Sequence, residues 1–182
     1  MKKNLIIALT ILVPFFSSAQ LSWEITAGAG ATFVDVESLV EEDESEGTWA
    51  SDWGVFNYGV SGQVFVENDS DFAFGAEVMW QNLYWYGVSI PYSYGRIYRE
   101  YSVSTTRLTS IVRYGVDDKY NVDLGLSFNF MDGLSMGLML SSNYYFPVSE
   151  NIDIPLKFRV DIIDDIVVTV PVSLNVGIRV KM

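Results

Sequence analysis

The end of the chain, residues 166–182, most constrains the fold because its apolar and polar positions alternate. Successive side chains of a β-strand point to opposite faces, so the pattern predicts one long strand with a wholly apolar face. At about 3.3 Å per residue, such a strand can cross a bilayer at a tilt. The apolar set is Ile166, Val168, Val170, Val172, Leu174, Val176, Ile178, Val180 and Met182.

Residues 1–19 have the features of a secretory leader. Lys2 and Lys3 form a basic start, residues 5–16 are apolar, and Ser17, Ser18 and Ala19 form a cleavage site of small residues. We expect this signal peptide to be removed, which leaves residues 20–182 as one barrel domain. The apolar run is too short for a membrane-spanning helix, which needs about 20 residues.

Composition excludes several classes of protein. The chain has no Cys, so no disulfide is expected, and its net charge of -12 argues against binding nucleic acid. No apolar run of about 18 residues follows the leader, which excludes a helical membrane protein. Because 49% of the residues are hydrophobic, a closed sheet remains, either a soluble ligand-binding barrel or a membrane barrel.

Alternation continues along the chain and predicts eight strands without a helix. Two of the connections are long: residues 35–52 are strongly acidic, and residues 82–98 are rich in Tyr and Trp. We expect the flanks of the second connection to extend the neighbouring strands as a hairpin above the membrane. Short turns and long loops on opposite rims are typical of outer-membrane barrels. The predicted strands are residues 21–33, 53–66, 71–81, 99–114, 120–130, 134–146, 152–162 and 166–182.

The two faces of these strands differ in residue size. One face has more large apolar side chains than an eight-stranded lumen would hold, whereas the other has many Gly and Ser residues. We therefore predict an apolar exterior facing lipid. The alternative is a soluble, lipocalin-like periplasmic or secreted barrel that binds an apolar ligand inside, because alternation alone does not decide between them.

Charged residues on the polar face are balanced. Buried charges must be paired, so equal numbers of acids and bases predict a salt-bridge network that fills the lumen. The strand pairing should be tightly set, because a shift of one residue would turn these charges toward lipid. The predicted network is Glu24, Glu77, Asp123, Asp153, Asp161, Arg107, Arg113, Lys157, Arg159 and Arg179.

Aromatic residues near the strand ends predict two girdles at the membrane surfaces. The candidates are Trp23, Tyr58, Phe72, Trp80, Tyr114, Tyr120, Phe130, Tyr144 and Phe146.

The last residues resemble the C-terminal assembly signal of outer-membrane barrels, with Asn175, Gly177, Val180 and Met182 in its polar, Gly, apolar and apolar positions. The chain ends on Met where Phe is usual. With the leader and the strand count, the mature chain resembles the small eight-stranded outer-membrane barrels of the OmpA/OmpX type. This resemblance implies an all-β, antiparallel, up-and-down transmembrane barrel in a bacterial outer membrane. Its implied partners are the barrel-assembly machinery, membrane lipid and lipopolysaccharide.

Catalysis is not expected, because the chain has neither His nor Cys and the predicted inward acids pair with bases. No catalytic residue and no cofactor are therefore assigned. Eight strands enclose only side chains, so a diffusion pore is not expected either. The remaining function is envelope integrity, adhesion or recognition.

Two predicted loops are candidates for binding. The acidic loop can supply carboxylates to Ca²⁺ through Glu41, Glu42, Asp43, Glu44 and Glu46, but it lacks the spacing of a dedicated site, and a solvated loop is the favoured interpretation. The aromatic loop can stack on a glycan or add a strand to a protein partner. Its alternative is a girdle with a packed tip. The residues are Tyr84, Trp85, Tyr86, Tyr92 and Tyr94.

Overall fold

A computed structural model of the chain describes residues 20–34, 49–51, 54–67, 71–89, 97–115, 119–130, 133–164 and 169–182. The predicted leader, the acidic residues 41–46, and Tyr92 and Tyr94 lie outside these ranges. In the described ranges no helix is long and apolar enough to span a membrane.

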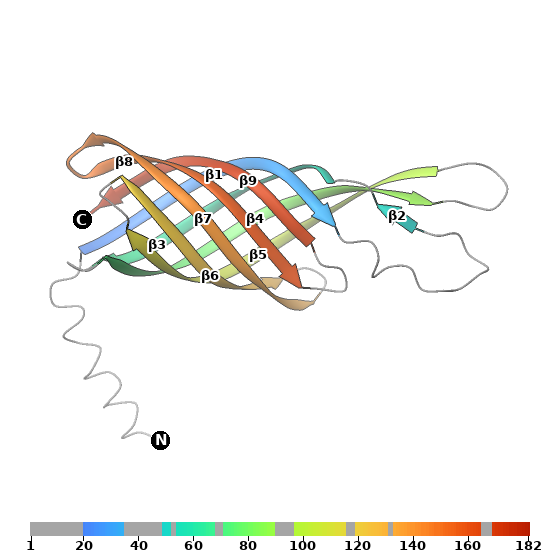
Figure 1. Cartoon of the computed structure of the whole chain (residues 1–182), viewed down its shortest axis with the longest axis horizontal. Coiled ribbons are helices and arrows are strands. Elements are labelled where there is room, and N and C mark those ends of the chain that lie inside the picture. The colour runs from blue at the N-terminus through green and yellow to red at the C-terminus, as the bar shows by residue number, and fades with distance from the viewer. Residues whose placement is uncertain are drawn as a thin grey trace, which may run out of the picture.

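The described chain is built of antiparallel β-strands (Figure 1). They are β1 (Gln20–Val34), β2 (Trp49–Ser51), β3 (Gly54–Glu67), β4 (Phe72–Ser89), β5 (Ile97–Gly115), β6 (Tyr120–Phe130), β7 (Leu134–Ser149), β8 (Ile152–Asp164) and β9 (Thr169–Lys181).

The sheet closes on itself as an up-and-down barrel. Each long strand pairs with its neighbours in the chain, and β1 pairs with β9 to complete the circle. The short β2 pairs only with β4, beyond the end of the β3–β4 pairing, so eight strands form the barrel wall. This confirms the predicted eight-stranded transmembrane fold, and both ends of the barrel domain lie at the same rim (Figure 1).

The pairing register sets the tilt of the strands. A path that starts at Leu21 on β1 and passes from each residue to its paired residue on the next strand goes once around the barrel. It returns to β1 at Ala31, ten residues further along the strand. For eight strands, a displacement of this size corresponds to a tilt of about 40°. Residues far apart in the sequence are thereby brought into shared rows that climb diagonally around the wall.

The side chains settle which face points outward. Leu124, Phe158 and Leu174 are 59%, 52% and 55% exposed, whereas the adjacent charged residues Asp123 and Arg159 are 0% and 4% exposed. A soluble carrier would require the opposite arrangement, with apolar groups inside and charges in water. The lipocalin-like alternative is therefore wrong, and the exterior is that of a membrane-spanning barrel.

Glycines allow close packing where β1 meets β9. A Cβ atom on Gly30 would collide with the backbone at Val172 and Ser173, and one on Gly177 would collide with the backbone at Ile25 and Thr26. The seam that closes the barrel therefore requires these small residues.

The structure differs from the predicted strands mainly at one rim. Strands β4 and β5 run to Ser89 and from Ile97, beyond the predicted bounds of 81 and 99, and this confirms the hairpin expected from the flanks of the 82–98 connection. Strand β2 lies within the segment predicted as an acidic loop, because its backbone pairs with the extended β4. Of the predicted final strand, residues 169–181 form β9, and residues 166–168 lie outside the described ranges.

Candidate functional site

The lumen contains the charges predicted from the sequence, arranged around Glu24. The Arg113 guanidinium lies 2.6 Å from Glu24 and 2.7 Å from Asp123. Lys157 forms a second ion pair with Glu24. The Tyr145 hydroxyl donates a hydrogen bond of 2.8 Å to the same carboxylate. One acid from β1 is thus held by side chains from β5, β7 and β8, which ties opposite walls of the barrel together.

A second cluster is centred on Arg159. Its guanidinium lies 2.7 Å from both Glu77 and Asp161. Asp161 also pairs with Arg107 at 2.8 Å. Gln63 connects the two clusters, because its amide donates to Glu77 and its oxygen accepts from Lys157. The network is therefore continuous through much of the lumen.

A third group lies at the rim that holds the chain end. Arg179 pairs with Glu67 and lies 3.7 Å from Asp153, which also pairs with Lys181 at 2.8 Å. Glu67 is missing from the predicted network because the sequence pattern places it in a turn with residues 68–70, after the predicted strand ends at residue 66. Its place two residues after the inward Phe65 was the signal that could have identified it.

Apolar and aromatic side chains fill the space beside the ion pairs. The Arg113 guanidinium stacks 3.6 Å from the centre of the Phe65 ring, and the buried Tyr145 ring lies between Arg113 and Arg179. Phe65 also belongs to a buried apolar cluster with Ala73, Ile111 and Met139. Ile111 of β5 therefore points inward, on the face where the strand otherwise has polar residues.

This filling predicts that the barrel does not conduct ions. We expect the purified protein to give no single-channel current in planar bilayers, because ion pairs and rings occupy the cross-section. A general porin reconstituted in parallel would show that the membrane preparation reports channels. Reproducible conductance steps from the wild-type protein would contradict a closed lumen.

The end of the lumen away from the chain termini is polar but poorly bonded. Arg107 is fully buried, and its Nε and Nη2 atoms make no hydrogen bond in the described part of the chain. Directly paired neighbours share this property: Asn129 lies opposite Arg107, and Ser135 lies opposite Asn129. The lumen thus changes along its axis from a densely bonded half to a loosely bonded one. The residues with unbonded side-chain atoms in this half are Asn57, Gln81, Asn82, Thr105, Arg107, Ser127, Asn129 and Ser135; those elsewhere, on Glu24, Asp153 and Arg179, belong to ion-paired side chains.

Aromatic contacts occur on the outside near both rims. Tyr58 packs 5.8 Å from Trp80 and stacks 6.2 Å from Tyr84, measured between ring centres. At the opposite rim Phe72 lies 5.2 Å from Tyr114. Tyr144 and Phe146, also near that rim, are 4.8 Å apart.

The predicted loop-recognition residues do not form one described site. Tyr84 belongs to the aromatic contacts around Tyr58, and its hydroxyl accepts a hydrogen bond from Asn82. Trp85 and Tyr86 lie on β4, but the structure does not describe their side chains. Among the described residues, no group of three acids could hold a metal ion.

The predicted assembly residues lie on β9 in the expected alternation. Asn175 is 5% exposed and faces the lumen, whereas Val180 and Met182 point outward. Gly177 lies at the tight β1–β9 seam.

Comparison with known proteins supports the fold. No protein-family model matches the chain, and no curated protein matches it in sequence. Among solved structures, Neisserial surface protein A has a TM-score of 0.52 and 12% identity, covering 89% of this chain and 97% of that one. Ail, the attachment invasion locus protein of Yersinia pestis, has a TM-score of 0.46 and 12% identity, covering 89% and 99%. At 12% identity, the similarity to Neisserial surface protein A concerns architecture only.

Proposed function

We propose that this chain is a non-enzymatic integral protein of a bacterial outer membrane, exported by a signal peptide and folded by the barrel-assembly machinery. It recognises a partner outside the cell through the raised sheet β2–β4–β5. The extension of the β4–β5 pair beyond the barrel wall is the observation that carries the recognition role (Figure 1). Its membrane partners are lipid and lipopolysaccharide.

The β4–β5 pair continues where its neighbours stop. On one side, β6 pairs with β5 only as far as Thr106, although β5 begins at Ile97. No other strand of the described chain pairs with that edge over residues 97–105. A free strand edge presents unpaired N–H and C=O groups, to which an extended segment of another protein can add. The raised sheet therefore supports recognition by strand addition.

The orientation of this sheet follows from the connections. Outer-membrane barrels place both chain ends and short turns in the periplasm and their longer loops outside. The raised sheet lies at the rim opposite the chain ends (Figure 1). It would therefore face the cell exterior, and the closed lumen leaves recognition rather than transport as its role.

Edge-blocking substitutions test this function. The Ser102 and Ser104 side chains are exposed on β5 beyond the pairing with β6. Lysines on an edge strand disfavour addition of another strand. Extended peptides that bind the barrel are first selected from a display library on the wild-type protein in nanodiscs. We expect the Ser102→Lys/Ser104→Lys variant to fold normally but to bind these peptides with a Kd at least about tenfold higher.

A matched control is Ser149→Lys, an exposed position at the opposite rim. It should bind the selected peptides like the wild type, and all variants should keep the gel-mobility difference between unheated and boiled barrels. A second variant, with residues 84–102 replaced by a short Asn-Gly turn, should also lose binding. Equal peptide binding by the wild type and the edge-blocked variant would contradict recognition through β5.

A further inference from the structure

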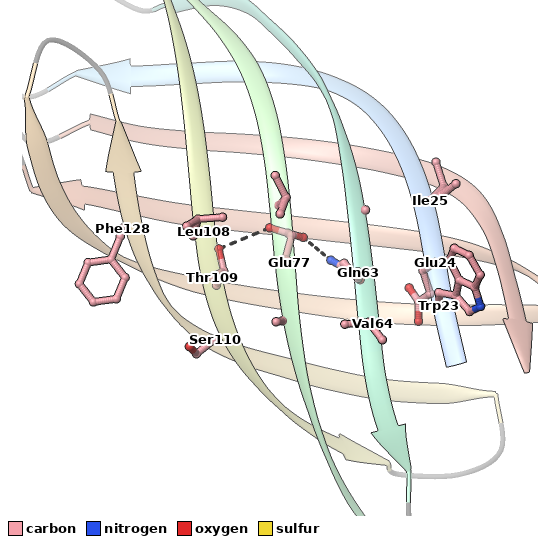
Figure 2. Close-up of a pocket in the computed structure, with 13 residues that line it drawn as sticks. Trp23, Glu24, Ile25, Gln63, Val64, Glu77, Leu108, Thr109, Ser110 and Phe128 are labelled. Carbon is pink, nitrogen blue, oxygen red and sulfur yellow. Dashed lines mark hydrogen bonds between the residues drawn. The ribbon is translucent and has the colours of Figure 1, made fainter. Parts of the chain in front are cut away.

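The outer wall of the barrel contains a groove across β1, β3, β4, β5 and β6 (Figure 2). Its volume is about 640 Å³. Small residues Gly62, Ala76 and Ser110 occupy its middle, and larger exposed side chains surround them. The surrounding side chains are Trp23, Ile25, Val64, Val78, Leu108 and Phe128, and the buried residues Glu24, Gln63, Glu77 and Thr109 also line the groove.

The groove lies at mid-height of the wall. On β4, Ala76 is an outward residue between Phe72, near one rim, and Trp80, near the other. The paired row that contains Ala76 joins Trp23, Val64 and Ser110, and the next row joins Ile25, Gly62, Val78, Leu108 and Phe128. Because the rows climb around the barrel, the groove runs diagonally across the depth at which lipid chains lie.

Gly62 is not required by the packing of the barrel itself. A Cβ atom on Gly62 would meet nothing within 4 Å, whereas a Cβ on Gly59 of the same strand would clash with the backbone of Trp80. Glycine within a strand costs stability, by roughly 0.5–1 kcal/mol relative to Ala. It often marks a place where a ligand approaches the backbone closely. An outward Gly with free space above it is therefore consistent with an occupant from outside the chain.

We propose that this groove binds one acyl chain of a phospholipid from the periplasmic leaflet. The groove is continuous with the apolar exterior, so the molecules that meet it are membrane lipids. A flexible chain can follow a diagonal hollow that side chains leave open. Trp23, at the end nearer the periplasmic rim, has an indole N–H suited to the ester region of such a lipid, whereas Phe128 at the other end has no polar group.

A second copy of the chain fits this surface less well. A two-fold interface places the same patch of both subunits face to face. Two hollows would then meet and enclose a void, whose lining atoms lose dispersion contacts. The shape thus favours a flexible lipid chain over another rigid barrel.

Native mass spectrometry of the full barrel tests the site. The wild type and Gly62→Leu are reconstituted with palmitoyl-oleoyl-phosphatidylethanolamine, returned to detergent, and compared for retained lipid. We expect one retained lipid per wild-type barrel and at least about tenfold lower occupancy in Gly62→Leu, because a Cβ at this position meets nothing within 4 Å and the rest of the leucine side chain would occupy the groove. Ala27→Leu adds a similar side chain to an exposed β1 position outside the groove and should retain lipid like the wild type.

Several results would overturn this site. Equal lipid retention by all three proteins, or no retained lipid on the wild type, would show that the groove contacts only bulk lipid and has no specific site. Preferential retention of purified lipid A in a parallel arm would refute the periplasmic leaflet. A wild-type dimer that Gly62→Leu dissociates would assign the groove to a second copy. If Gly62→Leu fails the gel-mobility test for folding, Ala76→Leu carries the same expectations at another groove position.

Discussion

Replacing Arg113 by Met should lower the free energy of unfolding by about 3–5 kcal/mol, which is typical of breaking a buried ion pair. Arg113 is the one ion-pair partner of Asp123 in the described chain, and Asp123 is fully buried. Glu24 keeps its pair with Lys157, so the loss arises mainly from the uncompensated Asp123 charge. Urea titration of the barrel in lipid vesicles, followed by Trp fluorescence, measures the change.

Two companion variants separate charge from packing. Arg113→Met/Asp123→Asn removes the unpaired Asp123 charge. It should recover more than half of the lost free energy of unfolding, because a neutral amide costs less to bury than a carboxylate. Lys181→Met breaks a partly exposed pair with Asp153 and should cost at most about 1 kcal/mol. If Arg113→Met is no more destabilising than Lys181→Met, the lumen network does not stabilise the barrel.

Leu124→Arg should destabilise the membrane-inserted barrel by about 2–4 kcal/mol, because it places a charge on the lipid-facing wall near mid-height. Leu124 lies in the middle of β6 and is 59% exposed. In a water-facing barrel the same exposed substitution would cost little. The comparison is again a urea titration in vesicles, with insertion checked by sedimentation with the membrane.

Leu134→Arg is the matched control at the rim. Leu134 is outward-facing at the start of β7, and charges near the membrane surface cost only about 0–1 kcal/mol. A similar small effect of Leu124→Arg and Leu134→Arg would argue that lipid does not cover the middle of the wall.

The barrel could be predicted from sequence because each membrane-facing strand carries its own signal. Leu124 and Asp123 alternate on β6 as Phe158 and Arg159 do on β8, and lipid outside with charge inside enforces that order. The signal fades where lipid is absent. Above the wall, Ser102 and Ser104 occupy outward positions on β5, so apolar alternation is weak there, although the predicted strand over residues 99–114 already included them.

The contacts between strands were less predictable than the strands themselves. The groove exists because the register places Gly62, Ala76 and Ser110 in adjacent rows of three strands, and no local pattern specifies that register. The link through Gln63 was missed for another reason: a neutral amide does not enter a count of balanced charges, although it joins Glu77 to Lys157.

The side-chain hydrogen bonds and ion pairs of the lumen are unevenly distributed, and this affects where the barrel unfolds locally. Near the chain ends, Glu24 and Arg113 hold opposite walls together, whereas at the far rim Arg107 and Asn129 contribute few such links. Local opening has a lower free energy where fewer interactions must break. Fluctuations should therefore fray the rim that carries the raised sheet first, which gives that sheet freedom to adjust while the opposite rim stays rigid.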